Sequence, residues 1–329
     1  MVGLEKHHFG VVKTVKSMLK PKTIQLTRRA NINDTLWNNC ITLSGANLGY
    51  AHCEYLDAMC EHGWVGLVYG NYEAVFPLPI KKLWGLFNYV VQPKFCQQLG
   101  VFGNLKECSE EDFLSAIPWY FFRVRLHLNS YNQAPLISGI TYKTNFILEL
   151  QYPIKINKDG QKNIRLVSHF NYAVNAIDAE PVIELYKQRW GALNPQIREL
   201  DYHRLLNATK RLGYVNDFSM KEIGFIVISA HPSTTNKDET NLHELIGAGL
   251  FLVTTQGPCR FAHFILGAPN PSHLESNGIM HGIINAALNH FQRKIDVFDF
   301  EGSSIPSVAE FYKKFNPIDK PFRILKKGL

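Results

Sequence analysis

The sequence predicts an α/β protein, of the α+β kind, in which mixed and mostly antiparallel sheets carry flanking helices. The chain has 329 residues, of which 46% are hydrophobic and 12% aromatic, so it has enough apolar surface to form a core. At roughly 150 residues per domain, this length favours two modules. The second half alternates helix-like and apolar strand-like segments, an order that places helices on both faces of a sheet.

The first half predicts a helix over residues 51–62, followed by a hairpin of strands 64–69 and 72–77 around Gly70 and Asn71. Ser109, followed by three acidic residues, marks the start of another helix. We also expect strands at residues 121–128 and 144–150. A polar turn at 158–160 is expected to lead into a third strand at 164–167.

The second half predicts helices at residues 177–190 and 202–212, the latter ended by Gly213. Further strands are expected at residues 223–229, 248–254, 260–266, 295–300 and 322–325, and further helices at 278–291 and 308–315. The organisation expected from this order is a basic N-terminal extension at 1–23, a first module at 24–176 and a second at 177–329.

Positive charge lies at the two ends of the chain. Residues 1–29 carry seven Lys and Arg against one Glu, and residues 311–329 carry six against one Asp, so the body is net acidic although the whole chain is +7. A nucleic-acid function based on pI alone is therefore weakly supported. Helical spacing in the N-terminal stretch leaves two readings open, a weak contact with an anionic membrane surface or a solvated arm.

The cysteines and the hydropathy favour a cytoplasmic protein. The six Cys include no C-x-x-C pair, and free thiols fit a reducing compartment. No run of about 18 apolar residues and no secretory signal is present, so we expect no transmembrane segment. His52, Cys53, Cys60 and His62 fit buried thiols on a helix better than a metal site, and we expect no metal.

Two carboxylates at the end of an apolar strand are the main catalytic candidates. Strand alternation puts Asp299 and Glu301 on one face, where burial costs several kcal/mol unless they are paired or hydrogen-bonded. Either one could serve as a general base or as a clamp for a substrate amine. The alternative is that both accept backbone N–H groups at the following turn. Ser303, or Ser304, is expected to cap the next helix, and Ser303 is also a candidate substrate contact.

Three further features complete the candidate site. The Tyr312 hydroxyl could protonate a leaving thiolate, with core packing as the alternative. The helix that begins after Asn277 and Gly278 offers free N–H groups to a pyrophosphate, and His281 lies in its first turn. The amides of Gln97 and Gln98 could bond a polar ligand in a cleft between the modules or close on the local backbone.

Residues 299–303, with Pro306 and Phe311-Tyr312, and the preceding residues 277–281 resemble a Bacteroidetes-type group within the GNAT and Fem-type aminoacyltransferase superfamily. Residues 72–79 and 97–102 carry the same resemblance, which covers about residues 24–325. It implies two GNAT-like modules and transfer of an acyl or aminoacyl group from a thioester or tRNA donor to an amine. Tyr312 resembles the general acid of the family, and the loop at Asn277, Gly278, Met280 and His281 takes the place of its pyrophosphate loop for acyl-CoA.

The implied acceptor is a small molecule or a peptidoglycan or polysaccharide precursor. One departure bears on the donor, because residues 274–280 hold a single glycine where the acyl-CoA loop of the family has a glycine-rich pattern. Fem-type enzymes share this departure and use aminoacyl-tRNA, which the basic ends would suit. The missing pattern also favours an alternative function, a non-catalytic ligand-binding protein that keeps the fold.

Overall fold

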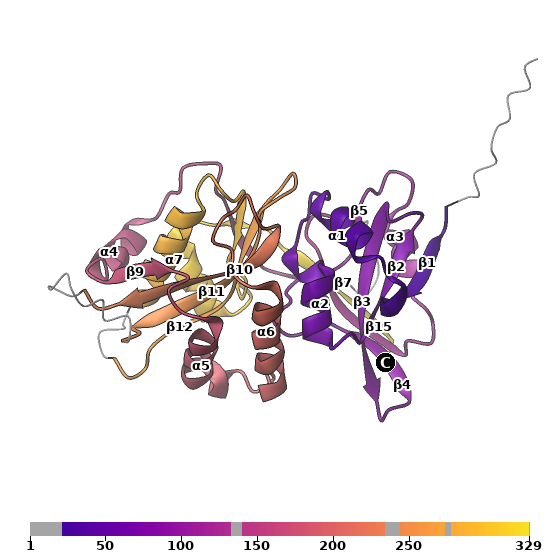
Figure 1. Ribbon diagram of the computed structural model, residues 1–329, viewed down its shortest axis with the longest axis horizontal. Coiled ribbons are helices and arrows are strands. Elements are labelled where there is room, and N and C mark those ends of the chain that lie inside the picture. The colour runs from indigo at the N-terminus through magenta and orange to yellow at the C-terminus, as the bar shows by residue number, and fades with distance from the viewer. Residues whose placement is uncertain (1–21, 133–139, 234–243, 274–277, 329) are drawn as a thin grey trace, which may run out of the picture.

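The computed structural model describes residues 22–132, 140–233, 244–273 and 278–328. These residues form two mixed, mostly antiparallel sheets with helices packed around them, in two lobes that lie side by side (Figure 1). The expected fold class is thereby confirmed. Residues 1–21, for which a membrane contact or a solvated arm was left open, and Asn277 lie outside the described residues.

The first sheet has eight strands among the described residues, in the order β1-β2-β3-β4-β6-β15-β7, with β5 paired to β3. Only the pairing of β4 with β6 is parallel within it. Its strands are β1 (Ile24–Arg28), β2 (Trp64–Tyr69), β3 (Ala74–Leu83), β4 (Phe87–Val91), β5 (Phe102–Gly103), β6 (Arg123–Leu128), β7 (Ile140–Lys143) and β15 (Phe322–Gly328).

The second sheet has seven described strands in the order β14-β8-β13-β12-β11-β10-β9, and only β12 and β13 run parallel. Its strands are β8 (Phe146–Glu149), β9 (Asn171–Val174), β10 (Ile223–His231), β11 (Gly247–Thr254), β12 (Phe261–Pro269), β13 (Val297–Asp299) and β14 (Ile318–Asp319). Every residue of β10 and β11 is buried, as expected for central strands covered on both faces.

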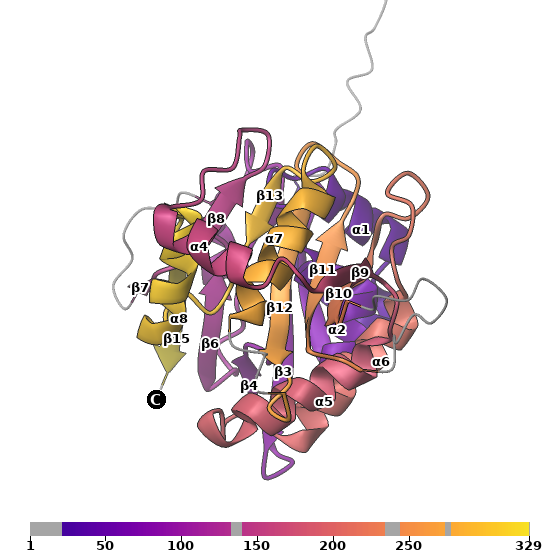
Figure 2. The same ribbon diagram turned by 90° about the vertical axis from the view of Figure 1, so that its left-hand side faces the viewer.

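The helices cover the sheets from both sides. In the first lobe they are α1 (Asp34–Thr42), α2 (Cys53–Cys60) and α3 (Glu110–Ser115); in the second, α4 (Lys158–Leu166), α5 (Ala179–Trp190), α6 (Glu199–Leu212), α7 (Ile279–Phe291) and α8 (Pro306–Tyr312). Leu250 and Leu252 of β11 share a core with α5, whereas Phe251 and Val253 share another with α7. This alternation follows the two-residue period of a strand. Figure 2 shows α7 lying across β11 and β12.

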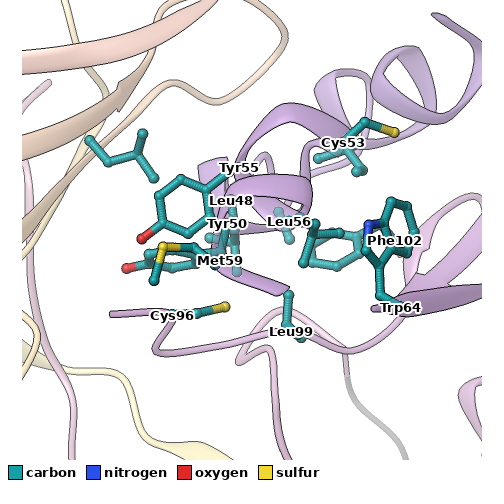
Figure 3. Packing of buried hydrophobic residues seen from close by; sticks show 14 of the residues in the cluster. Leu48, Tyr50, Cys53, Tyr55, Leu56, Met59, Trp64, Cys96, Leu99 and Phe102 are labelled. Carbon is teal, nitrogen blue, oxygen red and sulfur yellow. The ribbon is translucent and has the colours of Figure 1, made fainter. Parts of the chain in front are cut away.

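The two lobes pack directly on each other. Tyr55 of α2 stacks on Phe225 of β10 with 6.3 Å between the ring centroids. Gly49 lies so close to Leu252 that a Cβ at this position would be 2.8 Å from the leucine Cδ2. Figure 3 shows the first-lobe side of this core, where Tyr50, Tyr55 and other apolar residues from both sides of α2 gather. One apolar core therefore continues from the first lobe into the second.

Segments are exchanged between the sheets. β8, from the first half of the sequence, pairs with β13 and β14, whereas β15, from the end of the described chain, pairs with β6 and β7. The division into modules at residues 176 and 177 stays a prediction, and these crossing segments show that neither sheet is built from one half alone.

Residues 158–167 differ from the expectation of a turn and a strand. They form helix α4, because Asn157 caps it by accepting a hydrogen bond from the Gly160 N–H at 2.8 Å. The predicted hairpin, helix starts and later strands are observed with shifts of a few residues. Among the described residues, no helix is both long and apolar enough to cross a membrane.

Candidate active site

The candidate site lies where β13 separates from β12. The two strands pair in parallel up to His263 of β12, which lies opposite Asp299 of β13. Beyond this pair β12 continues, whereas the segment after β13 turns away. The turn passes through Glu301 and Gly302, with φ of 50° and 59°. A left-handed glutamate is uncommon, and such conformations cluster at functional sites. The fold thus holds Glu301 in the fork between two diverging strands.

Asp299 is the anchor of this turn. Its Oδ1 accepts a hydrogen bond from the Glu301 backbone N–H at 3.0 Å, and its Oδ2 accepts one from Asn145 Nδ2 at 3.1 Å. The first contact is the main-chain role considered as the alternative to catalysis. With both oxygens engaged and the side chain buried, Asp299 is suited to positioning Glu301.

A chain of amides connects Asp299 to the two glutamines singled out in the sequence. Asn145 Oδ1 accepts from Gln97 Nε2 at 3.1 Å, and Gln97 Oε1 accepts from Gln98 Nε2 at 3.0 Å. Gln98 Oε1 in turn accepts from the Ser130 backbone N–H at 2.9 Å. The structure therefore joins the glutamines, in the segment between β4 and β5, to the acidic strand end of the second sheet.

Ser303 belongs to the same cluster but does not cap a helix. Its Oγ accepts from the Phe146 N–H at 3.0 Å and donates to the Glu301 carbonyl at 3.2 Å. The expected capping role of Ser303 or Ser304 is wrong, because α8 starts only at Pro306, and its N-cap, Ile305, makes no side-chain cap. Ser303 instead fixes the Glu301 turn against the start of β8.

His263 lies between the two acids and is fully buried. Its Nδ1 is 3.8 Å from Asp299 Oδ2 and 3.9 Å from Glu301 Oε1, and its ring centroid is 4.5 Å from that of Tyr50. Both nitrogens of His263, Oε1 of Glu301 and the Tyr50 hydroxyl are buried with no hydrogen-bond partner in the described part of the chain. Nearly all buried polar groups have partners, so this concentration marks the cluster as a candidate functional site.

Burial also changes the pKa values of Glu301 and Tyr312, two of the catalytic candidates. It raises the pKa of Glu301 well above the ordinary glutamate value. It likewise raises the pKa of Tyr312, and the nearby charge of Glu301 raises it further. Tyr312 therefore keeps its phenolic proton at neutral pH, as a proton donor must.

Tyr312, the last residue of α8, packs among aromatic rings from several elements. The distances between ring centroids are 4.7 Å to Phe300, 5.4 Å to Phe311 and 6.5 Å to Phe264 of β12. This is the core-packing role considered as its alternative, and it places the Tyr312 ring beside β12 where β13 has departed.

The expected donor-loop residues form a second group at the start of α7. Gly278 is the N-cap, with φ of 84°, and Met280 packs on the edge of the apolar core. His281 Nε2 lies 3.2 Å from Asn163 Nδ2, and its ring centroid is 4.6 Å from that of Phe311. Burial lowers the pKa of His281 to about 4. Ring contacts through Phe311 connect His281 to Tyr312. Among the described residues, no hydrogen bond or ion pair joins this donor-loop group to Asp299 or Glu301.

Two cavities open elsewhere on the molecule. One of about 580 Å³ lies between α5 and the segment that precedes α7, and its lining includes Asn270 and His273. Another of about 490 Å³ lies between α2 and α6, and thus between the lobes, and its lining includes Asp57 and Arg211. Gln97 and Gln98 line neither of them.

The sequence reasoning missed His263, Asn145 and Tyr50. His263 carried one signal, because it is the lone ionisable residue in the apolar stretch 261–269. Asn145 and Tyr50 carried none, since only the pairing of distant strands and the packing of the lobes bring them to the site.

No protein-family profile matches the chain, and no curated protein matches it by sequence. Its fold matches solved structures over nearly its whole length. FemX has a TM-score of 0.58 at 9% identity, covering 92% of this chain and 97% of FemX. A conserved protein of unknown function from Bacteroides thetaiotaomicron has a TM-score of 0.55 at 10% identity, with 93% and 100% covered.

Saccharomyces cerevisiae N-myristoyltransferase with bound myristoyl-CoA has a TM-score of 0.50 at 9% identity, covering 94% of this chain and 80% of that one. The chain therefore shares its fold with FemX and with this N-myristoyltransferase. Membership of the GNAT and Fem-type superfamily, and of the narrower group defined by the residue 299–303 motif, stays a prediction.

Proposed function

We propose that this protein is an N-acyltransferase that moves an acyl or aminoacyl group from a thioester or tRNA donor to an amine. The observation that carries the proposal is the set of unpartnered polar atoms of His263, Glu301 and Tyr50 in the fork between β12 and β13. The register of β11 on β12 also leaves Ile265 without a partner residue, two positions beyond His263. Such bulges are frequent next to active sites.

In the proposed reaction the amine nitrogen attacks the acyl carbonyl carbon, the new C–N bond forms and the bond to the donor sulfur or oxygen breaks. Glu301 accepts the proton of the amine, directly or through water, and Tyr312 gives its proton to the leaving group. An incoming ammonium beside Glu301 would stabilise the carboxylate and lower its raised pKa, which prepares it as the base. Asp299 and Ser303 hold the turn at Glu301, and His263 orients the Glu301 carboxyl group.

The donor would bind at the start of α7, where Gly278, Met280 and His281 lie, with Asn277 adjoining them in the sequence. Free N–H groups at a helix start suit a phosphate, and both acyl-CoA and aminoacyl-tRNA carry phosphates. Gln97 and Gln98 would contact the acceptor, a small molecule or a peptidoglycan or polysaccharide precursor with a free amine.

Thermal unfolding with acetyl-CoA, longer acyl-CoA and charged tRNA tests the donor site. A true donor at about 100 times its Kd adds roughly 2.7 kcal/mol of stability. With the donor in hand, Glu301→Gln and Tyr312→Phe are expected to lower kcat, whereas Glu310→Gln, an exposed change on α8, leaves it unchanged. Full turnover by both site variants would remove these roles.

A non-catalytic ligand-binding protein is the second candidate. The observation that favours it is the packing of Phe264, Phe300 and Tyr312, whose rings occupy the space beside β12. Under this function no donor would raise the unfolding temperature, and an amine ligand alone would do so, with the effect lost in Glu301→Gln.

A further inference from the structure

The hairpin turn between β3 and β4 exposes a set of large apolar side chains. Trp84 is 82% exposed and Leu86 79%, and Leu83 and Phe87 beside them are also exposed. In Figure 1 this hairpin extends beyond the rest of the first lobe, next to the C-terminal end of β15. Large apolar groups gathered on a surface usually mark an interaction site.

The backbone conformation of the turn does not favour a tryptophan at position 84, so the stability of the fold does not explain this residue. Trp84 and Gly85 both have positive φ, 53° and 74°, and the Leu86 N–H donates to the Leu83 carbonyl at 3.1 Å, as in a type I′ turn. Asn-Gly is the preferred pair for such a turn, and a bulky residue at positive φ costs stability. Because the Trp84 ring is exposed, packing within the protein does not offset that cost.

A second aromatic segment lies at the same end of the sheet. β4 and β6 run parallel, so residues preceding β6 lie near the hairpin turn. Phe122 confirms this, since its ring centroid is 6.1 Å from that of Phe87. Just before it, Trp119 is 89% exposed and Tyr120 is exposed as well. We define the hairpin patch as Leu83, Trp84, Leu86, Phe87, Trp119 and Tyr120.

Exposed cations border the hairpin patch. β15 runs antiparallel to β6, with Lys326 opposite Arg125 and Lys327 next to it, and Lys82 precedes the turn. No Asp or Glu occurs in the segments that bring these residues together, 79–92, 117–128 and 320–328. The border is therefore cationic, complementary to an anionic surface.

We propose that the hairpin patch docks this protein on an anionic lipid bilayer. Trp and Tyr prefer the interface between headgroups and hydrocarbon, Leu and Phe enter deeper, and Lys or Arg beside them attract anionic lipid. A protruding tip with apolar side chains around it can enter a bilayer, whereas docking on a protein would need a broad complementary face. The proposal is independent of the catalytic one, because none of these residues belongs to the candidate active site.

Flotation of the full chain with vesicles tests this directly. The wild type is expected to float with vesicles of 70% phosphatidylcholine and 30% phosphatidylglycerol, less with phosphatidylcholine alone, and less in 0.5 M salt. Trp84→Ser with Leu86→Ser is expected to weaken partitioning at least about tenfold. Lys326→Glu with Lys327→Glu is expected to weaken it mainly at low salt.

The matched control is Leu43→Ser with Leu193→Ser, which removes two exposed apolar side chains, one at the end of α1 and one after α5 in the second lobe, outside the segments that form the hairpin patch. This variant should float like the wild type, and circular dichroism should show both serine variants folded. Failure of the wild type to float, or equal loss in the control, would overturn the proposal. Concentration-dependent dimerisation abolished by the hairpin change, without flotation, would overturn it in favour of a second copy of the chain.

Discussion

Replacing Glu301 with glutamine is expected to stabilise the protein at neutral and alkaline pH. Burial raises the pKa of Glu301 in the folded protein well above its ordinary value of 4.5, which the unfolded chain keeps. Between the two pKa values the folded state binds one more proton than the unfolded state. Stability is therefore fully present below the ordinary pKa and falls as the pH rises towards the raised one. The loss is about 1.4 kcal/mol of unfolding free energy per pH unit.

Urea unfolding of the wild type and of Glu301→Gln at pH 5, 6, 7 and 8 measures this loss. Glutamine has the shape of the protonated acid and does not ionise, so its free energy of unfolding lacks this dependence on pH. The difference between the two proteins should grow with pH in favour of the variant. Glu310→Gln is the control, because Glu310 is exposed on α8 and pairs with Lys313 at 2.6 Å.

A difference that stays flat from pH 5 to pH 8 would refute the reasoning. It would mean that Glu301 is already ionised in the folded protein across this range of pH, so that burial does not raise its pKa.

Three further changes test other parts of the structure. Arg323→Met leaves the buried Glu110 without the cation that contacts it at 2.7 Å and should cost about 3–5 kcal/mol in urea unfolding, most of it recovered when Glu110→Leu is added. His281, with its pKa lowered to about 4, should titrate near that value by NMR. Because the unfolded chain takes up this proton at a higher pH than the folded protein, the free energy of unfolding should fall by about 3 kcal/mol between pH 6.5 and pH 4. His281→Gln should lack this fall. Gly103→Ala should lower the free energy of unfolding by about 3 kcal/mol, because φ is 102° and the new Cβ would lie 2.6 Å from Cys40 Sγ; Gly45→Ala, with open space around it, is its control.

Helices and strands that begin at a capping residue or a turn-forming pair were predictable from the sequence. Ser109 and Asp112 form the reciprocal cap that the acidic run after Ser109 indicated, and the strands around Gly70 and Asn71 pair as a hairpin. Helix α4 was missed because Lys158-Asp159-Gly160 has turn composition and the helix presents little apolar surface. The capping residue Asn157 was the available signal.

The candidate site was predictable only in part, for a different reason. Asp299, Glu301 and Ser303 are close in sequence, so their proximity was predictable. The strand alternation expected for Asp299 and Glu301 was wrong, because β13 ends at Asp299 and Glu301 lies in the left-handed turn that follows. Their link to Gln97 passes through Asn145, which reaches the site because β8 pairs with β13 across about 150 residues of chain. Pairing over such a separation leaves no local pattern to detect.

The exchange of strands has a consequence for how the protein is made. β6 and β7 leave the ribosome long before β15, their partner in the first sheet. Until residue 328 has been synthesised, the facing edges of both strands offer unpaired N–H and C=O groups to any other chain nearby. A nascent or truncated chain that stops before β15 is therefore most prone to aggregate at this gap.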